Sequence, residues 1–63
     1  MRFEFYTGSM NGFATDHSAS DAFKKFLARK RKKLNDCGIL VKFRPLDNKS
    51  PWFYQEAESL LKG

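Results

Sequence analysis

The residues best suited to chemistry in this sequence are seven basic side chains within positions 24–33, a stretch that contains no acid. The rest of the chain carries five basic and seven acidic residues, so the net charge of +5 at pH 7 arises from this stretch. Like charges four residues apart on a helix repel by about 0.2–0.5 kcal/mol per pair, and a polyanion relieves that repulsion. The cluster therefore predicts a surface for nucleic acid, RNA or DNA, whose contacts come from Lys25, Arg29, Arg31, Lys32 and Lys33.

A purely structural explanation of the same cluster stays open. Cations near the C-terminal end of a helix interact favourably with its dipole, and Lys-rich faces keep small proteins in solution. On a helix over residues 20–36, Lys25, Arg29 and Lys32 lie opposite the apolar stripe, where they can contact phosphates. Lys30 falls within the apolar stripe, so its aliphatic stem is expected to pack while its ammonium reaches solvent.

The sequence offers no set of residues for catalysis. His17 and Cys37 are each the only residue of their type, and they belong at opposite ends of the predicted helix, about 24 Å apart. A single cysteine also excludes an intramolecular disulfide and every multi-cysteine zinc site. The glycines at positions 8 and 12 are not followed by the Gly-Lys-Ser/Thr ending of a nucleotide-binding loop. We expect a protein that is not an enzyme and has no cofactor, metal ion or catalytic residue.

The elements that position the cluster begin with a strand and a loop. The first residues alternate in character, with Phe3 and Phe5 on one side, which predicts a strand with one buried face. Residues 8–18 are rich in loop-forming types and are expected to form a long connection. Met10 or Phe13 is expected to pack beneath that loop as an anchor.

A helix follows, and its beginning and end both carry signals. Ser18 or Ser20 can cap its first turn, and Gly38 is the expected left-handed residue that ends it after Asp36. Cys37 is expected to pack beneath that end as a small apolar residue. The apolar stripe of the helix comprises Ala19, Phe23, Phe26, Leu27 and Leu34.

The second half of the chain predicts one further strand and an ambiguous segment. Residues 39–44 alternate again, with Ile39, Val41 and Phe43 on the buried side. Residues 52–54 are three consecutive aromatics, which favour a short antiparallel strand before a closing helix over residues 55–62. One helix from Pro51 onward is the alternative. These aromatics are expected to close the core, and if they are exposed they become an anchor for a protein interface.

Together these segments predict an α+β fold in one small domain over residues 1–63, in the order β-α-β-(β)-α. A strand, a helix and a strand in sequence favour a right-handed crossover between two parallel strands. We expect a two- or three-stranded sheet with the helices on one face, because so short a chain cannot cover both faces. The uncovered face would carry Arg2, Glu4, Tyr6, Leu40, Lys42 and Arg44.

That uncovered face gives the alternative function, a protein-interaction module. It would be an adaptor, an inhibitor or a homodimer that uses the sheet face or the aromatic cluster, with the basic helix steering it to an acidic partner. Tyr6 beside Lys42 and Arg44 also has the chemistry of a surface on which unpaired bases stack, although a lone surface tyrosine needs no special explanation. The single cysteine and the lack of a long apolar segment favour a cytoplasmic protein without a membrane partner.

Overall fold

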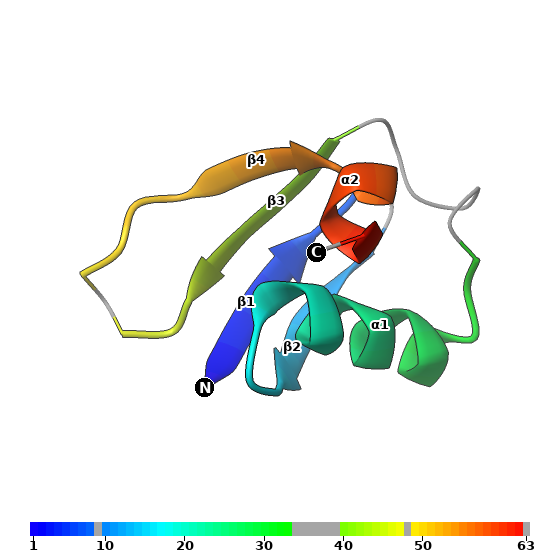
Figure 1. The fold of residues 1–63 in the computed structure, drawn as a ribbon, viewed down its shortest axis with the longest axis horizontal. Coiled ribbons are helices and arrows are strands. Elements are labelled where there is room, and N and C mark those ends of the chain that lie inside the picture. The colour runs from blue at the N-terminus through cyan, green and yellow to red at the C-terminus, as the bar shows by residue number, and fades with distance from the viewer. Residues whose placement is uncertain (9, 34–39, 48, 63) are drawn as a thin grey trace.

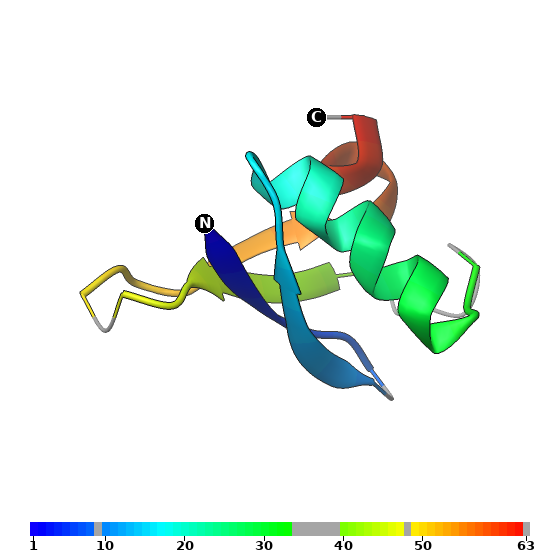
Figure 2. The same ribbon diagram turned by 90° about the horizontal axis from the view of Figure 1, so that it is seen from below.

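The protein is built on an antiparallel sheet with both helices on the same side of it (Figure 1 and Figure 2). A computed structural model describes residues 1–8, 10–33, 40–47 and 49–62, and these form four strands and two helices. The strand order is β2-β1-β3-β4, and every neighbouring pair is antiparallel. The elements are β1 (Arg2–Tyr6), β2 (Asn11–Thr15), α1 (Ala19–Lys30), β3 (Leu40–Pro45), β4 (Phe53–Glu56) and α2 (Ala57–Lys62).

The strand β2 corrects the prediction of a loop over residues 8–18. Its sequence, Asn-Gly-Phe-Ala-Thr, has few strand-forming residues, and only one of its five side chains is buried. It is a strand because its backbone N–H and C=O groups pair with those of β1, which makes β2 one edge of the sheet. In this register Gly12 lies opposite Phe5. Gly12 also allows α1 to approach closely, since a Cβ at this position would lie 3.0 Å from Phe26 Cε1.

The presence of β2 also overturns two further expectations about the sheet. The described residues form a sheet of four strands rather than two or three, and β1 and β3 are antiparallel rather than parallel. The helix leaves β2 instead of β1, so the crossover joins β2 to β3. Because both strands are antiparallel to β1, they run in the same direction on either side of it. The predicted parallel pairing of the strand at residues 2–7 with the strand at residues 39–44 is therefore wrong.

The helix α1 begins where the sequence predicts and ends earlier. Ser18 is the N-cap, and its hydroxyl accepts a 3.2 Å hydrogen bond from the Asp21 N–H. The helix stops at Lys30 rather than at Asp36, because Arg31 adopts the left-handed conformation with φ of 54°. The last buried residue of α1 is Leu27, and the three residues that follow Lys30 are all cations. The predicted roles of Leu34, Asp36, Cys37, Gly38 and Ile39 lie outside the described residues.

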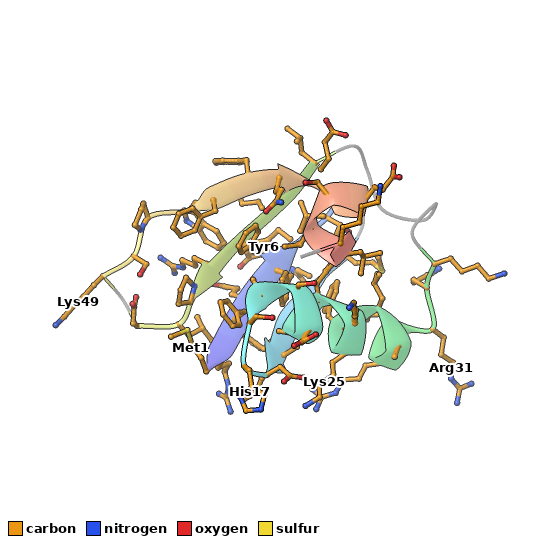
Figure 3. The ribbon with its side chains drawn as sticks, viewed as in Figure 1. Met1, Tyr6, His17, Lys25, Arg31 and Lys49 are labelled. Atoms are coloured by element: carbon orange, nitrogen blue, oxygen red, sulfur yellow. The ribbon has the colours of Figure 1, made fainter. Side chains whose placement is uncertain are left out.

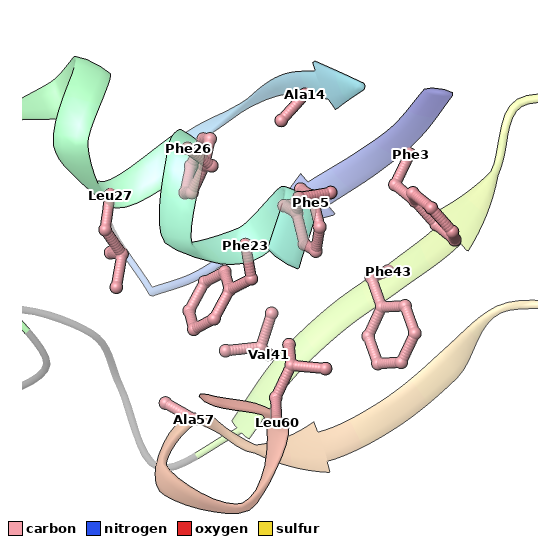
Figure 4. Packing of buried hydrophobic residues seen from close by; sticks show 11 residues of the cluster. Phe3, Phe5, Ala14, Phe23, Phe26, Leu27, Val41, Phe43, Ala57 and Leu60 are labelled. Atoms are coloured by element: carbon pink, nitrogen blue, oxygen red, sulfur yellow. The ribbon is translucent and has the colours of Figure 1, made fainter. Parts of the chain in front are cut away.

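The hydrophobic core lies between the sheet and the helices and is centred on Phe5 (Figure 4). The Phe5 ring centroid lies 5.4 Å from that of Phe23 and 5.5 Å from that of Phe26. Burial of each such ring is worth about 1.5–3 kcal/mol, which makes the phenylalanines the main source of stability. The buried cluster comprises Phe3, Phe5, Ala14, Ala22, Phe23, Phe26, Leu27, Val41, Phe43, Ala57 and Leu60.

The strand alternative is confirmed for Phe53 and Tyr54, whereas Trp52 precedes β4 and the closing helix begins at Ala57 rather than at residue 55. β4 pairs with β3 in an antiparallel register that places Phe53 opposite Phe43 and Tyr54 opposite Lys42. α2 then packs on the core through Ala57 and Leu60. The expectation that the aromatic residues 52–54 lie in the core is wrong, because none of them belongs to the buried cluster.

Candidate nucleic-acid interface

The cations in the first two turns of α1 are engaged with acidic partners. Lys25 Nζ lies 3.4 Å from Asp16 Oδ2 and donates a 2.9 Å hydrogen bond to the Thr15 carbonyl. The His17 N–H donates to Asp16, and this bond together with Lys25 lowers the pKa of the Asp16 carboxyl. Lys24 similarly lies 3.8 Å from Asp21. These contacts connect the start of α1 to the end of β2 and offset two of the seven positive charges.

The cations at the other end of α1 have a different environment. Arg29, Lys30, Arg31 and Lys32 are all exposed, and none of them forms an ion pair with another residue that the structure describes. The left-handed turn at Arg31 changes the direction of the chain within this run. Figure 3 shows the Arg31 side chain extending outward from the end of α1. We call these four residues the cationic tip.

The cationic tip differs from the helical surface that the sequence predicts. Lys25 and Arg29 lie on α1, whereas Arg31, Lys32 and Lys33 follow its last residue. These five residues therefore do not share one helix face, because the helix ends before three of them. The expected packing of the Lys30 stem fits the structure, in which its Cε would lie 3.6 Å from a Cβ at Gly12.

The face of the sheet that points away from the helices forms a second surface, which we call the open face. Since alternate residues Phe3, Phe5, Val41 and Phe43 are buried beneath the helices, their neighbours along β1 and β3 point to the opposite side. The six residues expected on the uncovered face therefore lie there. The open face comprises Arg2, Glu4 and Tyr6 of β1, Asn11, Phe13 and Thr15 of β2, Leu40, Lys42 and Arg44 of β3, Tyr54 and Glu56 of β4, and Trp52.

Trp52 is held on the open face by two cations and a tyrosine. Lys42 Nζ and Arg44 Cζ each lie 4.4 Å from the centre of the Trp52 ring, within the range of cation–π interactions. The Tyr6 ring centroid lies 5.2 Å from that of Trp52. The ring is half-buried, so part of its surface still faces solvent.

A small polar network beneath this group orders the same side chains. Arg44 Nε lies 3.2 Å from Glu4 Oε1, and the Tyr6 hydroxyl donates a 2.7 Å hydrogen bond to Glu4 Oε2. This hydrogen bond raises the pKa of the Tyr6 hydroxyl, because the phenol must stay protonated to donate it. Both carboxylate oxygens of Glu4 are thus occupied, and its charge is balanced by Arg44.

Two further aromatic rings lie at the edges of the open face. Phe13 on β2 is 52% exposed and Tyr54 on β4 is 62% exposed. Phe13 is thus not the anchor beneath the first loop, whereas Met10 is partly buried against the core. Neither Phe13 nor Trp52 was expected on this face from the sequence. The alternation of Trp52 with Tyr54 across Phe53 is the signal that could have placed Trp52 there.

The described residues contain no group of three or more His, Cys, Asp or Glu side chains that could hold a metal ion. A hollow of about 400 Å³ lies beside the start of α1, lined by residues that include Ser18, Lys24, Gln55 and Lys62. Within the described residues, neither helix is long and apolar enough to cross a membrane. The cationic tip and the open face are therefore the two surfaces with a distinctive composition.

No protein-family model, curated protein or solved structure matches this chain. The geometry defines a small α+β protein with a four-stranded antiparallel sheet, two helices on one face and aromatic and basic side chains on the other.

Proposed function

We propose that this protein is a non-enzymatic module that binds nucleic acid, and that the cationic tip supplies the main electrostatic contact. The observation that carries the proposal is the run of four exposed cations, Arg29 to Lys32, without an ion pair to any other described residue. By contrast, Lys24 and Lys25 have acidic neighbours. Lys25 is therefore a weaker candidate than in the sequence-based prediction, and Lys33 extends the proposed surface.

The physical reason for this choice is the cost of holding like charges together. Cations on consecutive residues repel one another, and nothing in the packing of the core requires them, since Arg29 and Arg31 are exposed. A phosphate backbone removes that repulsion and releases its own condensed counterions when it is neutralised. Such binding depends on charge rather than on base sequence, so we expect little sequence selectivity from the tip alone.

The test is the salt dependence of affinity for a short DNA duplex, measured by fluorescence anisotropy. Four neutralised phosphates predict a slope of about −3.6 for log affinity against log salt concentration. The triple variant R29Q/R31Q/K32Q should reduce the slope to about −0.9, because it retains one of the four contacts. The matched control is K24Q/K49Q/K62Q, which removes the same charge from exposed lysines elsewhere and should change the slope far less.

Three outcomes contradict the proposal. Binding that ignores salt would exclude a phosphate contact, and no binding near 50 mM salt would make the cations a solubilising surface. Equal losses in the two triple variants would show that net charge matters and that the tip does not.

A protein-interaction module is the second candidate, and the exposed apolar side chains of the open face favour it. Leu40 is 52% exposed, and Phe13 and Tyr54 are exposed to a similar or greater extent. An acidic protein partner retained after nuclease treatment would support this function. A homodimer through the open face is less well supported, because each face carries three cations, Arg2, Lys42 and Arg44, against the two acids Glu4 and Glu56.

A further inference from the structure

We infer that the open face stacks unpaired bases, so that the ligand of this protein is single-stranded nucleic acid. The inference rests on the proposed function and adds to it the class of nucleic acid and a second contact surface. Single-stranded nucleic acid is bound by grooves or sheets that combine aromatic rings with cations, because every base has a face that stacks and every nucleotide carries a phosphate.

The strand register places a cation between two rings in one row of the open face. Tyr54 on β4 lies opposite Lys42 on β3, which lies opposite Tyr6 on β1. In the neighbouring row, Arg44 lies opposite Glu4, which lies opposite Phe13 on β2. In the first row, Lys42 therefore has a ring on either side. In the second row, Glu4 separates Arg44 from Phe13, and the ring adjacent to Arg44 is Trp52. Stacking of a base beside a phosphate contact requires such neighbouring rings and cations.

The central ring of this surface is ordered before any ligand binds. Trp52 contacts Lys42, Arg44 and Tyr6, and Arg44 is itself tied to Glu4. A side chain fixed in this way loses little further conformational entropy when it binds a base. These contacts therefore hold the Trp52 ring in place, and a base can stack on the part of the ring that faces solvent.

The outer rings set the length of strand that the face can hold. Phe13 and Tyr54 lie on β2 and β4, the two outer strands of the sheet. Three inter-strand spacings of about 4.8 Å separate them by about 14 Å. Open sheet faces of comparable width stack two or three bases in RNA-binding modules, so we expect a similar number here.

The charges on the open face favour a polyanion over a second copy of this chain. Lys42, Arg44 and Arg2 face Glu4 and Glu56 there, and the Glu4 carboxylate is already occupied by Arg44 and Tyr6. The remaining charge is cationic and suits phosphates. Two open faces packed together would instead desolvate Arg2 and Lys42 of each copy, with Glu56 as the one acid of each face that forms no ion pair with another described residue.

The cationic tip lies at the edge of the sheet where β1 ends and β2 begins. Lys30 Cε would lie 3.6 Å from a Cβ at Gly12, on the helix side of the sheet. Asn11, which precedes Gly12, lies opposite Tyr6, the last residue of β1. A single strand that stacks on Tyr6 and Trp52 can therefore continue around this edge to the tip, whereas a rigid duplex cannot follow both surfaces.

The first test compares oligo(U), oligo(dT) and a duplex, each about 12 nucleotides long, by fluorescence anisotropy. The variant F13L/Y54L removes both outer rings while it keeps apolar side chains at exposed positions. It should weaken binding of the single strands at least about tenfold and leave duplex binding unchanged. The matched control is F53L, which removes the neighbouring ring on the other face of β4. This variant should change neither single-strand binding nor duplex binding.

The second test uses the emission of Trp52, the only tryptophan in the chain. Saturating oligo(dT) should quench this emission in the wild-type protein, because a thymine stacked on the excited indole accepts an electron from it. The variant R29Q/R31Q/K32Q should require more oligonucleotide but reach the same quenching at saturation. This readout needs no substitution in the open face and stays valid if a face variant folds poorly.

The outcomes separate this inference from the proposed function. Loss of single-strand binding in F13L/Y54L together with Trp52 quenching supports both. A different outcome would be binding that depends on the cationic tip, is unchanged in F13L/Y54L and does not quench Trp52. That outcome overturns the inference about the open face and leaves the proposed function in place. Absence of any nucleic-acid binding overturns both, and a wild-type dimer that F13L/Y54L dissociates would assign the open face to a second copy instead.

Discussion

Arg44 lies between Trp52 and Glu4, with its Cζ 4.4 Å from the centre of the Trp52 ring and its Nε 3.2 Å from Glu4 Oε1. One side chain on β3 thereby connects β1 to the residue that precedes β4. Because Arg44 is always protonated and planar, it can stack on an aromatic ring and donate to a carboxylate at once. This double contact holds the open face in the geometry on which the proposed stacking depends.

Replacement of Arg44 by methionine should therefore destabilise the protein and release Trp52. The variant keeps much of the aliphatic stem but loses the cation–π interaction and the half-buried ion pair, for a combined cost of about 1–2 kcal/mol. Urea unfolding followed by Trp52 emission measures this cost. Arg2→Met is the matched control on the same face, since Arg2 forms no ion pair with another described residue. Equal losses in the two variants would contradict the role assigned to Arg44.

Gly12→Ala should destabilise the protein although alanine is the better residue for an ordered strand. The new Cβ would lie 3.0 Å from Phe26 Cε1, and Phe26 cannot move aside because its ring is buried and packed against Phe5. Overpacking of this kind costs about 1–3 kcal/mol. Denaturant unfolding beside the exposed control Asn11→Ala measures it, and the control should lie within about 0.5 kcal/mol of wild type. A stabilised Gly12→Ala variant would show that Phe26 can adjust.

Ser18→Ala should lower stability by about 1 kcal/mol, because the Asp21 N–H would lose its capping acceptor. For a domain of this size, that corresponds to a fall in Tm of about 4–8 °C. Thermal unfolding followed by circular dichroism measures the change. Ser18→Asp should restore most of it, since an aspartate accepts the same hydrogen bond. Failure of this rescue would mean that Ser18 acts through something other than the cap.

The carboxyl of Asp47 should titrate with a pKa of about 2, below its ordinary value of 3.8. The Lys49 N–H donates to it, and so do the N–H and the hydroxyl of Ser50, which favours the ionised form. Since the folded pKa is depressed, the contribution to stability is present above about pH 4 and is lost as the pH falls toward 2. NMR titration measures the pKa, and Ser50→Ala should raise it toward 3.8. An unchanged pKa in that variant would contradict the contribution assigned to the Ser50 hydroxyl, since the two N–H donors remain.

The sequence predicts the elements whose signals are local. Phe3 and Phe5 alternate along β1, Ser18 caps α1, and Phe23 and Phe26 recur at helical spacing, and the structure confirms each of these. These signals depend on residues within one or two turns of each other. They need no knowledge of the rest of the chain.

β2 shows where local signals fail. Asn11 and Gly12 are poor strand formers, and the Phe13 side chain is exposed to solvent rather than buried in the core. The strand exists because the edge of β1 requires a hydrogen-bonding partner and because α1 needs a position without a Cβ beside Phe26. Both requirements arise only in the folded protein. Because β2 could not be predicted, neither the direction of β3 relative to β1 nor the number of strands in the sheet could be predicted.

The two candidate surfaces also differ in how far the sequence predicts them. The cations between residues 24 and 33 are evident from composition, and the structure changes their arrangement from one helix face to a tip beyond Lys30. The open face depends more on tertiary structure. Tyr6, Lys42 and Arg44 were expected there, but Trp52 joins them only because β4 pairs with β3 and brings a distant residue across the sheet.

By itself, the sequence determined the positive charge of residues 24–33, the start of α1 at Ser18 and the aromatic side chains available for the core. Tertiary structure decided the strand order, the end of α1 and the grouping of Trp52 with Arg44. The physical reason is the range of the interactions. Capping and amphipathic spacing act between neighbours along the chain, whereas strand pairing and ring packing bring together residues that only the complete fold makes adjacent.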